Sequence, residues 1–570
     1  MKGCRNQGGI HQLQDQFAGL NDSGGMLRVN VRMNHLGELP WAAWQMQWAQ
    51  ESGMEVLMTV FGGTGGASAP GGGGSGSPGG QLDPSSSVPA DLAGWSMSVV
   101  AMLGEVRRMT GSLPDHLEIW NEPDRPEFFS GTIQNYLAIY SALAPRVRAQ
   151  YPQIGIGGMG LAGSESDMGT GDSALFSLID HAAEHGLPLD FLSWHNYGIG
   201  ASMRYTRIPE RLDAALAAHG MAADLFVTEW NVRATTARNS HEFDTSSSAA
   251  NMVTFLSSAV GQGVDGNAFF MLWDTDDQEG IADLTGKALG AMTARALKKP
   301  VWRTMELVYP MADETRFGVQ VPDNEYALGL LATWDGNRAR VALANDAVEP
   351  EWVWTRGCRE IGMEPGETAI LVRDAGGTTT SPPERAALIA EGLTPAEADA
   401  VLAVIDRVAE AADLRVRSRT VVLTLSGSSQ PSVLRAWRFD STHNAPAAHL
   451  ETLFPHLEQV ERDAQAAAEA AAAAKVAEFG GSVPPNLSWT GSIEALAAAL
   501  GITVEEVKVV IAVYRTTLKM ERVSQSEFLN SLPGAALVEE SGAEAGVQIN
   551  GNQLTVELEP NGVLILDINP

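Results

Sequence analysis

The chain has 570 residues, which is too long for a single hydrophobic core, so we expect two to four domains. Its formal net charge of −31 argues against nucleic acid and anionic membranes as partners, because phosphate binding needs clustered Lys and Arg. A run of about 18 apolar residues, as a transmembrane helix requires, does not occur, so we expect no membrane insertion.

Apolar strands alternate with helical stretches through the first half of the chain. Strands separated by helices at this spacing are typical of parallel βαβ units. The nearly continuous apolar character of these strands fits a sheet that is covered on both faces. The predicted strands are residues 26–34, 54–61, 116–123, 154–160, 190–198, 225–232 and 267–274.

This half of the chain is predicted to form an α/β fold, a (β/α)8 TIM barrel whose first strand is atypical or missing. Residues 1–9, where that strand is expected, have a poor strand pattern. An open doubly wound sheet is the alternative. Polar residues at several strand ends favour the barrel, because those ends line the active-site face of such barrels.

After residue 300 the pattern changes to one of antiparallel strands with turn residues between them. A capping box of Thr394 and Glu397 predicts a helix start within residues 382–414. The other predicted strands are 317–322, 326–334, 338–346, 367–374, 420–427 and those within 547–568; the other predicted helices are 456–479 and a helix–turn–helix pair at 491–519.

The simplest domain organisation has three parts. Residues 1–305 form the barrel, residues 306–377 and 541–570 form an accessory β-sandwich, and residues 378–540 form a mainly helical insertion in that sandwich. The insertion could mediate self-association or bind a protein partner.

Two carboxylates follow predicted barrel strands. Glu122 ends the stretch LEIWNE, and Glu229 lies in LFVTEWN. In a barrel both would converge on the active-site face. Glycoside hydrolysis needs such a pair, one carboxyl to donate a proton and the other to act as nucleophile or base. Either residue alone could be an ordinary rim residue, but two matched strand ends indicate function.

Asn-Glu-Pro after one strand and Thr-Glu-Trp after another resemble glycoside hydrolase clan A. More narrowly, IWNEPD, DFLSWHNYG and FVTEWN resemble family 39, which includes β-xylosidases, α-L-iduronidase and exopolysaccharide glycosidases. The resemblance covers about residues 10 to 310 and the idea of a C-terminal sandwich. It implies that Glu122 is the general acid/base, that Glu229 is the nucleophile of a retaining mechanism, and that Asn121 binds the sugar hydroxyl next to the anomeric carbon.

Further residues are candidates for substrate binding or for positioning the carboxylates. His195 and Tyr197 share a strand face, so Tyr197 could orient Glu229 while His195 contacts the substrate or the acid/base. The clan places an Arg on the strand at 26–34; Arg28 aligns best, although Arg32 is nearer the strand end. Trp273 could be an apolar sugar platform, and Trp230 a rim contact.

The sequence therefore predicts a glycoside hydrolase acting on a β-linked glycoside or polysaccharide, without a cofactor or metal. Asp274, Asp276 and Asp277 lack the spacing of a calcium loop. A non-catalytic glycan-binding or structural protein on the same scaffold is one alternative, and a transglycosylase is another. No apolar signal segment begins the chain, so the protein is expected in the cytoplasm or exported by a non-classical route, unless its true start lies upstream.

Overall fold

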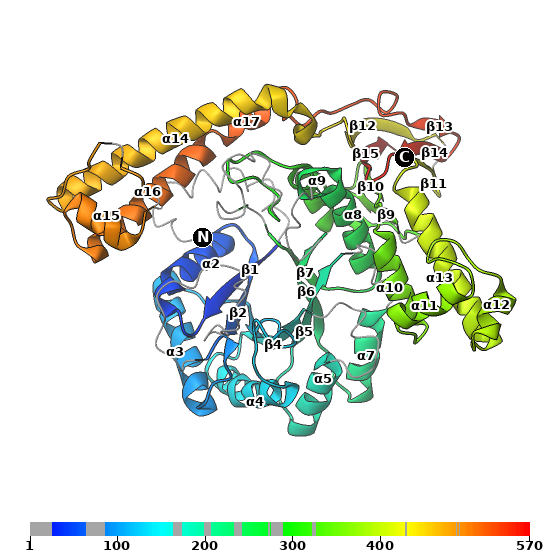
Figure 1. Cartoon of the computed structure of the whole chain (residues 1–570), viewed down its shortest axis with the longest axis horizontal. Helices are drawn as coiled ribbons and strands as arrows, with labels where there is room; N and C mark the ends of the chain where they lie inside the picture. The colour runs from blue at the N-terminus through cyan, green and yellow to red at the C-terminus, as the bar shows by residue number, and fades with distance from the viewer. Residues whose placement is uncertain are drawn as a thin grey trace.

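The fold is seen in a computed structural model (Figure 1). No helix in the described ranges combines the length and the apolar character that crossing a membrane requires. The structure describes residues 25–63, 86–162, 174–198, 207–232, 242–271, 274, 289–321, 327–427, 430–485, 487–489 and 491–569.

The first half of the chain is a nearly closed parallel barrel, as predicted. Its strands follow chain order across one sheet, and the two outermost strands approach each other (Figure 1). The strands are β1 (Met26–Arg32), β2 (Glu55–Phe61), β3 (His116–Ile119), β4 (Gly155–Leu161), β5 (Phe191–Tyr197), β6 (Asp224–Asn231) and β7 (Gly266–Phe269). The helices around them are α2 (Leu39–Glu51), α3 (Leu92–Thr110), α4 (Ile133–Gln150), α5 (Ala174–His185), α7 (Ile208–Ala218), α8 (Ser246–Gly261) and α9 (Pro300–Val308).

Local sequence explains where these elements begin and end. The Asp91 side chain accepts a hydrogen bond from Gly94 N–H and starts α3, which ends at Gly111 in the left-handed conformation that glycine adopts without strain. Thr132 and Asn135 form a capping box at the start of α4. Shorter elements lie between the longer helices and strands of the chain: η1 (Leu36–Glu38), η4 (Glu242–Asp244), η5 (Tyr309–Ala312), η6 (Pro446–His449) and β8 (Thr315–Arg316).

Two antiparallel sheets form the predicted sandwich. The larger sheet is buried on both faces: Phe439 and Ile565 pack into the barrel core, whereas Val341 and Leu566 pack against Val556 of the smaller sheet. The larger sheet has the order β12 (Ser432–Phe439), β15 (Val563–Asn569), β10 (Ala339–Asn345), β9 (Leu328–Trp334), β8; the smaller has β11 (Arg419–Thr424), β14 (Gln553–Leu558), β13 (Gln548–Asn550).

Helices interrupt the sandwich in two places. The first block precedes β11, and the second, which we call the arm, follows β12 and extends past the barrel (Figure 1). The domain boundaries at 377/378 and 540/541 stay a prediction, as does a role of this region in self-association. The first block is α10 (Pro350–Glu360), α11 (Pro365–Asp374), α12 (Arg385–Ala390) and α13 (Pro395–Leu414); the arm is α14 (Leu450–Glu478), α15 (Ile493–Leu500), α16 (Val504–Ser524) and α17 (Ser526–Ser531).

Two predicted strands are wrong. In the predicted strand 317–322, the described residues 317–321 follow β8 and belong to no strand. Residues 367–374 lie in helix α11, not in the antiparallel sheet. Pro365 stands at the first position of this helix, where a missing N–H is harmless and a fixed φ is favourable. The predicted capping box of Thr394 and Glu397 is confirmed at the start of α13.

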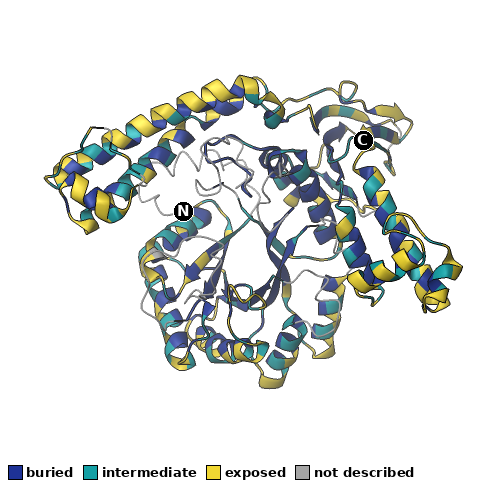
Figure 2. Cartoon of the chain, in the orientation of Figure 1, coloured by how far each residue is buried: buried dark blue, intermediate teal, exposed yellow. Residues whose placement is uncertain are grey.

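The arm has one buried face and one solvent-facing side (Figure 2). Helices α14 and α17 of the arm contact residues 296 and 297, which precede α9 of the barrel half. Leu297 packs among Leu453, Leu457 and Leu529, and the Ala296 carbonyl accepts hydrogen bonds from α17. The arm is therefore anchored by both apolar packing and backbone recognition.

Candidate active site

The chain leaves β3 in an unusual backbone conformation. Trp120 has φ 78° and Glu122 has φ 49°, in the left-handed region that residues with a side chain rarely adopt. Two hydrogen bonds hold the backbone after β3 in this conformation: Glu122 N–H donates to the Gly160 carbonyl at 2.9 Å, and Trp120 Nε1 donates to the Phe128 carbonyl at 3.0 Å. Such conformations cost about 1–3 kcal/mol each and persist where the surroundings enforce them, typically at functional sites.

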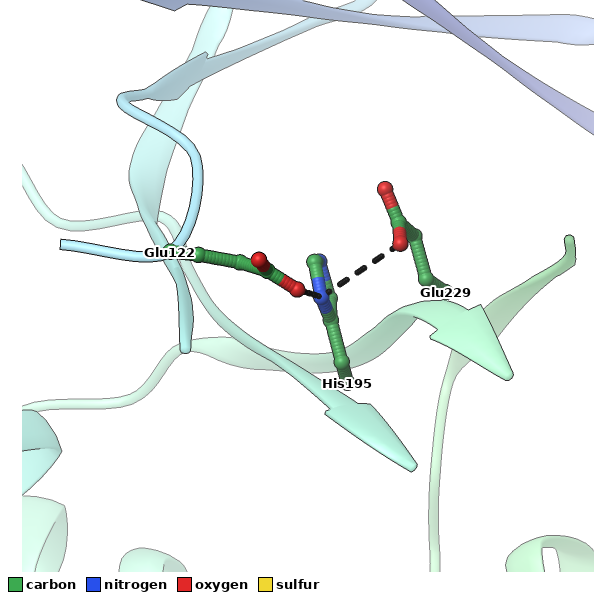
Figure 3. A group of neighbouring side chains, drawn as sticks. All are labelled: Glu122, His195 and Glu229. Carbon is green, nitrogen blue, oxygen red and sulfur yellow. Dashed lines mark hydrogen bonds and ion pairs between the residues drawn. The ribbon is translucent and has the colours of Figure 1, made fainter. Parts of the chain in front are cut away.

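Glu122 faces Glu229 across His195 (Figure 3). His195 Nδ1 lies 2.7 Å from Glu122 Oε1 and 3.5 Å from Glu229 Oε2. One ligand atom from each of the three residues lies within 4.8 Å of the others. The two carboxyl groups therefore approach each other closely, and their side chains are only 12% and 11% exposed.

Both oxygens of Glu229 have protein partners. The Tyr197 hydroxyl donates to Oε2 at 2.7 Å, and Arg28 Nη1 forms an ion pair with Oε1. Arg28 Nη2 also donates to Asn121 Oδ1 at 2.7 Å, so the amide nitrogen of Asn121 is the group that can bind a sugar hydroxyl. Glu229 is thus fixed from two strands, β1 and β5.

A register irregularity explains how β6 presents two successive side chains to the interior. Val227 pairs with Trp194 and Glu229 pairs with His195, which leaves Thr228 as an extra residue. A bulge of this kind re-aims side chains near active sites. Thr228 consequently donates a hydrogen bond into the same cluster that Glu229 enters, at 2.8 Å to Glu118 Oε1.

Glu118 belongs to the site, although no sequence motif selects it. Its carboxylate is fully buried and accepts from Arg28 Nε at 2.9 Å, Arg28 Nη2 at 2.5 Å and Thr59 Oγ1 at 2.7 Å. A charged residue in the middle of a buried apolar strand is the signal that could have identified it.

Burial and charge act against each other on the titratable groups here. Burial alone would lower the pKa of His195, but Glu229 and the hydrogen bond with Glu122 raise it above its usual value. Burial and the nearby Glu229 carboxylate both raise the pKa of Tyr197, which therefore remains a hydrogen-bond donor. The pKa of Arg28 is raised because Glu118 and Glu229 outweigh its desolvation.

Within the described residues, Glu122, His195 and Glu229 are the group whose spacing could hold a metal ion. Their ligand atoms are already engaged, however: His195 Nδ1 by Glu122, and the Glu229 oxygens by Tyr197 and Arg28. The Arg28 guanidinium would also repel a cation bound to Glu229. The donor set therefore fits acid/base and nucleophilic chemistry better than metal binding.

The structure brings together six of the candidate site residues and leaves two, Arg32 and Trp230, apart. Arg28 is in the cluster, whereas Arg32 is exposed at the end of β1. Trp230 is buried, stacks on Phe255 and donates to Asn267 Oδ1, so it lies in the layer between sheet and helix. Trp273 lies outside the described residues. The residues brought together are Arg28, Asn121, Glu122, His195, Tyr197 and Glu229.

The region that carries this cluster, apart from Arg28, matches a known family. Residues 114–348 match the model of glycosyl hydrolases family 39. This stretch of the chain is similar to the family 39 glycoside hydrolases. The resemblance of IWNEPD, DFLSWHNYG and FVTEWN to this family is thereby confirmed, and the matched stretch contains both Glu122 and Glu229.

Individual proteins agree with this. The chain is 21% identical over 272 residues to a β-xylosidase of Caldicellulosiruptor saccharolyticus. The match covers 43% of this chain and 53% of that protein, so the chain spans about half the length of the curated relative.

Two solved structures share the fold. A GH39 enzyme from Xanthomonas axonopodis pv. citri aligns with a TM-score of 0.53 and 14% identity, covering 98% of this chain and 90% of that one. A monomeric β-xylosidase from Caulobacter crescentus CB15 aligns with a TM-score of 0.53 and 13% identity, covering 99% and 93%. At these identities the likeness shows that the chain shares its fold with the two enzymes.

Proposed function

We propose that the protein is a retaining glycoside hydrolase with Glu122 as general acid/base and Glu229 as nucleophile. The observation that carries the proposal is the close approach of the two carboxyl groups, with one oxygen of each within 4.8 Å of the other. Retaining glycosidases need a separation of about 5–5.5 Å, whereas inverting ones need about 6.5–9.5 Å to admit a water molecule. Membership of the matched region in family 39 supports the reaction class.

In the first step Glu229 attacks the anomeric carbon while Glu122 protonates the departing oxygen. The Glu229 carboxylate is oriented for this attack by Tyr197 and Arg28. Asn121, held by Arg28, would donate to the neighbouring sugar hydroxyl, a contact that strengthens as positive charge develops on the ring. The product of this step is a covalent glycosyl-enzyme.

In the second step Glu122, now ionised, takes a proton from water, and the water oxygen displaces Glu229 from the anomeric carbon. His195 Nδ1 lies at hydrogen-bond distance from Glu122 and can keep that carboxyl turned toward the reacting bond. Two displacements at one carbon return its original configuration, so the released sugar keeps the anomeric form of the substrate.

The proposed substrate is a β-linked glycoside or glycan. β-Xylosides are the first to test, since the curated relative and the Caulobacter crescentus enzyme are both named β-xylosidases. The choice between exo and endo action is left to product analysis.

The proposal is tested with a panel of aryl β-glycosides and polysaccharides. Wild type is compared with Glu122→Ala, Glu229→Ala and, as a control from the same loop as Glu122, the exposed Glu127→Ala. We expect turnover by wild type and by Glu127→Ala, and a loss of several orders of magnitude in the two site variants. Azide should restore Glu229→Ala with inverted product and Glu122→Ala with retained product.

Two results would contradict the proposal. Equal glycan binding by wild type and both site variants without turnover would indicate a binding protein on a glycosidase scaffold. Transfer to an added sugar acceptor in preference to water would indicate a transglycosylase that uses the same intermediate.

A further inference from the structure

Glu118 is a buried charge for which the two-step reaction gives no direct use. Its side chain is fully buried, and its contacts include Arg28 on β1, Thr59 on β2 and Thr228 on β6. Strand β4 makes room for it, because a Cβ added at Gly160 would lie 3.2 Å from Glu118 Oε1. Replacing a buried ion pair by apolar residues is often neutral or stabilising, so stability is a weak reason to keep this carboxylate.

Arg28 is shared between Glu118 and the proposed nucleophile. Nε and Nη2 of the guanidinium donate to Glu118, while Nη1 pairs with Glu229. Glu118 is ionised: burial would raise its pKa, but Arg28 above all, with His195, Thr59 and Ser193, lowers it below its usual value. Arg28 and Glu118 together therefore carry no net charge, and the field that Glu229 experiences from Arg28 is partly cancelled.

We propose that Glu118 is a positioning residue that limits how strongly Arg28 stabilises the Glu229 carboxylate, and so keeps that carboxylate reactive. This inference rests on the proposed function. A carboxylate that is strongly paired with a cation is a poorer nucleophile and a better leaving group. Glu118 therefore favours the first step of the reaction over the second.

The two steps respond oppositely because Glu229 changes charge in opposite directions. In the first step an oxygen lone pair of Glu229 forms the bond to the anomeric carbon, the glycosidic bond breaks, and the leaving oxygen takes the proton of Glu122. In the second step water bonds to the anomeric carbon, the ester bond breaks, and its electron pair returns to Glu229. A stronger cation beside Glu229 hinders the first step and assists the second.

The test is Glu118→Gln, which keeps the shape and removes the charge. Two aryl glycosides of the same sugar, one with a good and one with a poor leaving group, separate the steps: kcat/KM reports the first, and kcat with the good leaving group reports the second. We expect kcat/KM to fall by about 10- to 100-fold, because the unbalanced charge of Arg28 stabilises the Glu229 carboxylate of the free enzyme more than it stabilises the transition state of the first step. The second step should stay within about threefold of wild type or become faster.

The matched control is Asp567→Asn, at a fully buried carboxylate that pairs with arginines in the sandwich. It should change stability and leave the ratio of the two steps unchanged. An equal fall of both steps in Glu118→Gln would show a merely structural role and overturn the proposal. If Glu118→Gln does not fold, Glu118→Asp, which keeps the charge but shortens the reach to Arg28, should slow the first step in the same sense by a smaller factor.

A second readout does not depend on glycosidase activity. In Glu118→Gln the positive charge of Arg28 is no longer balanced, so the pKa of His195, followed by NMR, should fall relative to wild type. An unchanged His195 titration would overturn the proposal. If His195 shifts as expected but wild type cleaves no glycoside, the charge balance stands and the proposed function fails.

Discussion

Two fully buried carboxylates in this molecule use arginine in different ways. Asp567, on the inner strand β15 of the larger sheet, is paired with Arg338 at 2.8 Å, Arg340 at 3.0 Å and also Arg435. Glu118, inside the barrel, is paired with Arg28 and shares this arginine with Glu229.

The difference lies in the second carboxylate that each arginine binds. Arg338 and Arg340 also pair with Asp335 and Glu314, which the proposed reaction does not use, and β15 is flanked by two strands of a sheet buried on both faces, so this cluster suits a permanent structural link. The second partner of Arg28 is Glu229, the proposed nucleophile. Ion pairs with arginine thus stabilise the sandwich and, under the proposed function, orient a reacting carboxylate in the barrel.

The largest expected effect is on stability, at the sandwich cluster. Asp567→Asn removes the charge that holds three arginines, and breaking a buried ion pair from one side costs about 3–5 kcal/mol. Urea unfolding measures the loss. Asp335→Asn, a more exposed partner of Arg338, is the control and should cost no more than about 1 kcal/mol. Equal losses in the two variants would show that the cluster is not a structural link.

The next effect is on activity, at Arg28. Arg28→Lys cannot bridge Glu118, Asn121 and Glu229 at once, because an ammonium group lacks the planar fork. We expect kcat/KM to fall by about 10²-fold, because Glu229 and Asn121 lose the group that orients them. The exposed Arg32→Lys should behave as wild type. Wild-type activity of Arg28→Lys would show that Glu229 does not depend on Arg28, and would contradict the contrast between the Glu118 and Asp567 clusters.

A smaller effect is expected at Tyr197. Tyr197→Phe removes a hydrogen bond to a carboxylate, which is worth about 1.5–3 kcal/mol, so kcat/KM should fall by about 10- to 100-fold. The control is Tyr140→Phe, which removes a hydrogen bond to the Pro188 carbonyl far from the site. Steady-state kinetics on both variants should show the loss in the first and near-normal activity in the second.

The smallest effect is a pH dependence of stability that arises from His195 in the barrel cluster. The pKa of His195 is raised on folding, so its protonation adds stability that is complete below its unfolded value of about 6.5 and is lost as pH rises through the higher folded value. The deficit of His195→Gln relative to wild type should therefore be larger at pH 6 than at pH 9. Denaturant unfolding at both pH values measures it, and the opposite order would contradict the assigned charge state.

Much of the barrel and of its site can be predicted from the sequence, because the alternation of apolar strands with helices and the polar residues at strand ends are local patterns. The strand pattern alone puts His195 and Tyr197 on one face of their strand, and in the structure His195 contacts both carboxylates while Tyr197 contacts Glu229. Trp230 is expected at the rim, but the bulge at Thr228 brings Glu229 inward and directs Trp230 outward. A bulge depends on pairing between strands, which a single strand sequence does not reveal.

Glu118 and residues 367–374 show two other limits. The charge of Glu118 in an apolar strand marks it as unusual, but its proposed role depends on Arg28, which is 90 residues away in the chain and which the local sequence does not reveal. Residues 367–374 have apolar positions that suit a strand and a helix equally, and packing of Val372 against neighbouring helices selects the helix. In both cases the deciding partner is distant in sequence.

The position of β15 has a consequence for synthesis on the ribosome. β15 lies between β10 and β12 in the larger sheet, yet β10 ends at Asn345 and β15 begins at Val563. Chains are made at about 5–20 residues per second, so β10 waits many seconds for its neighbour. Until β15 is made, the edges of β10 and β12 that it later covers have no strand partner. Unpaired strand edges can pair with other chains, so we expect the nascent sandwich to be prone to aggregation during this interval.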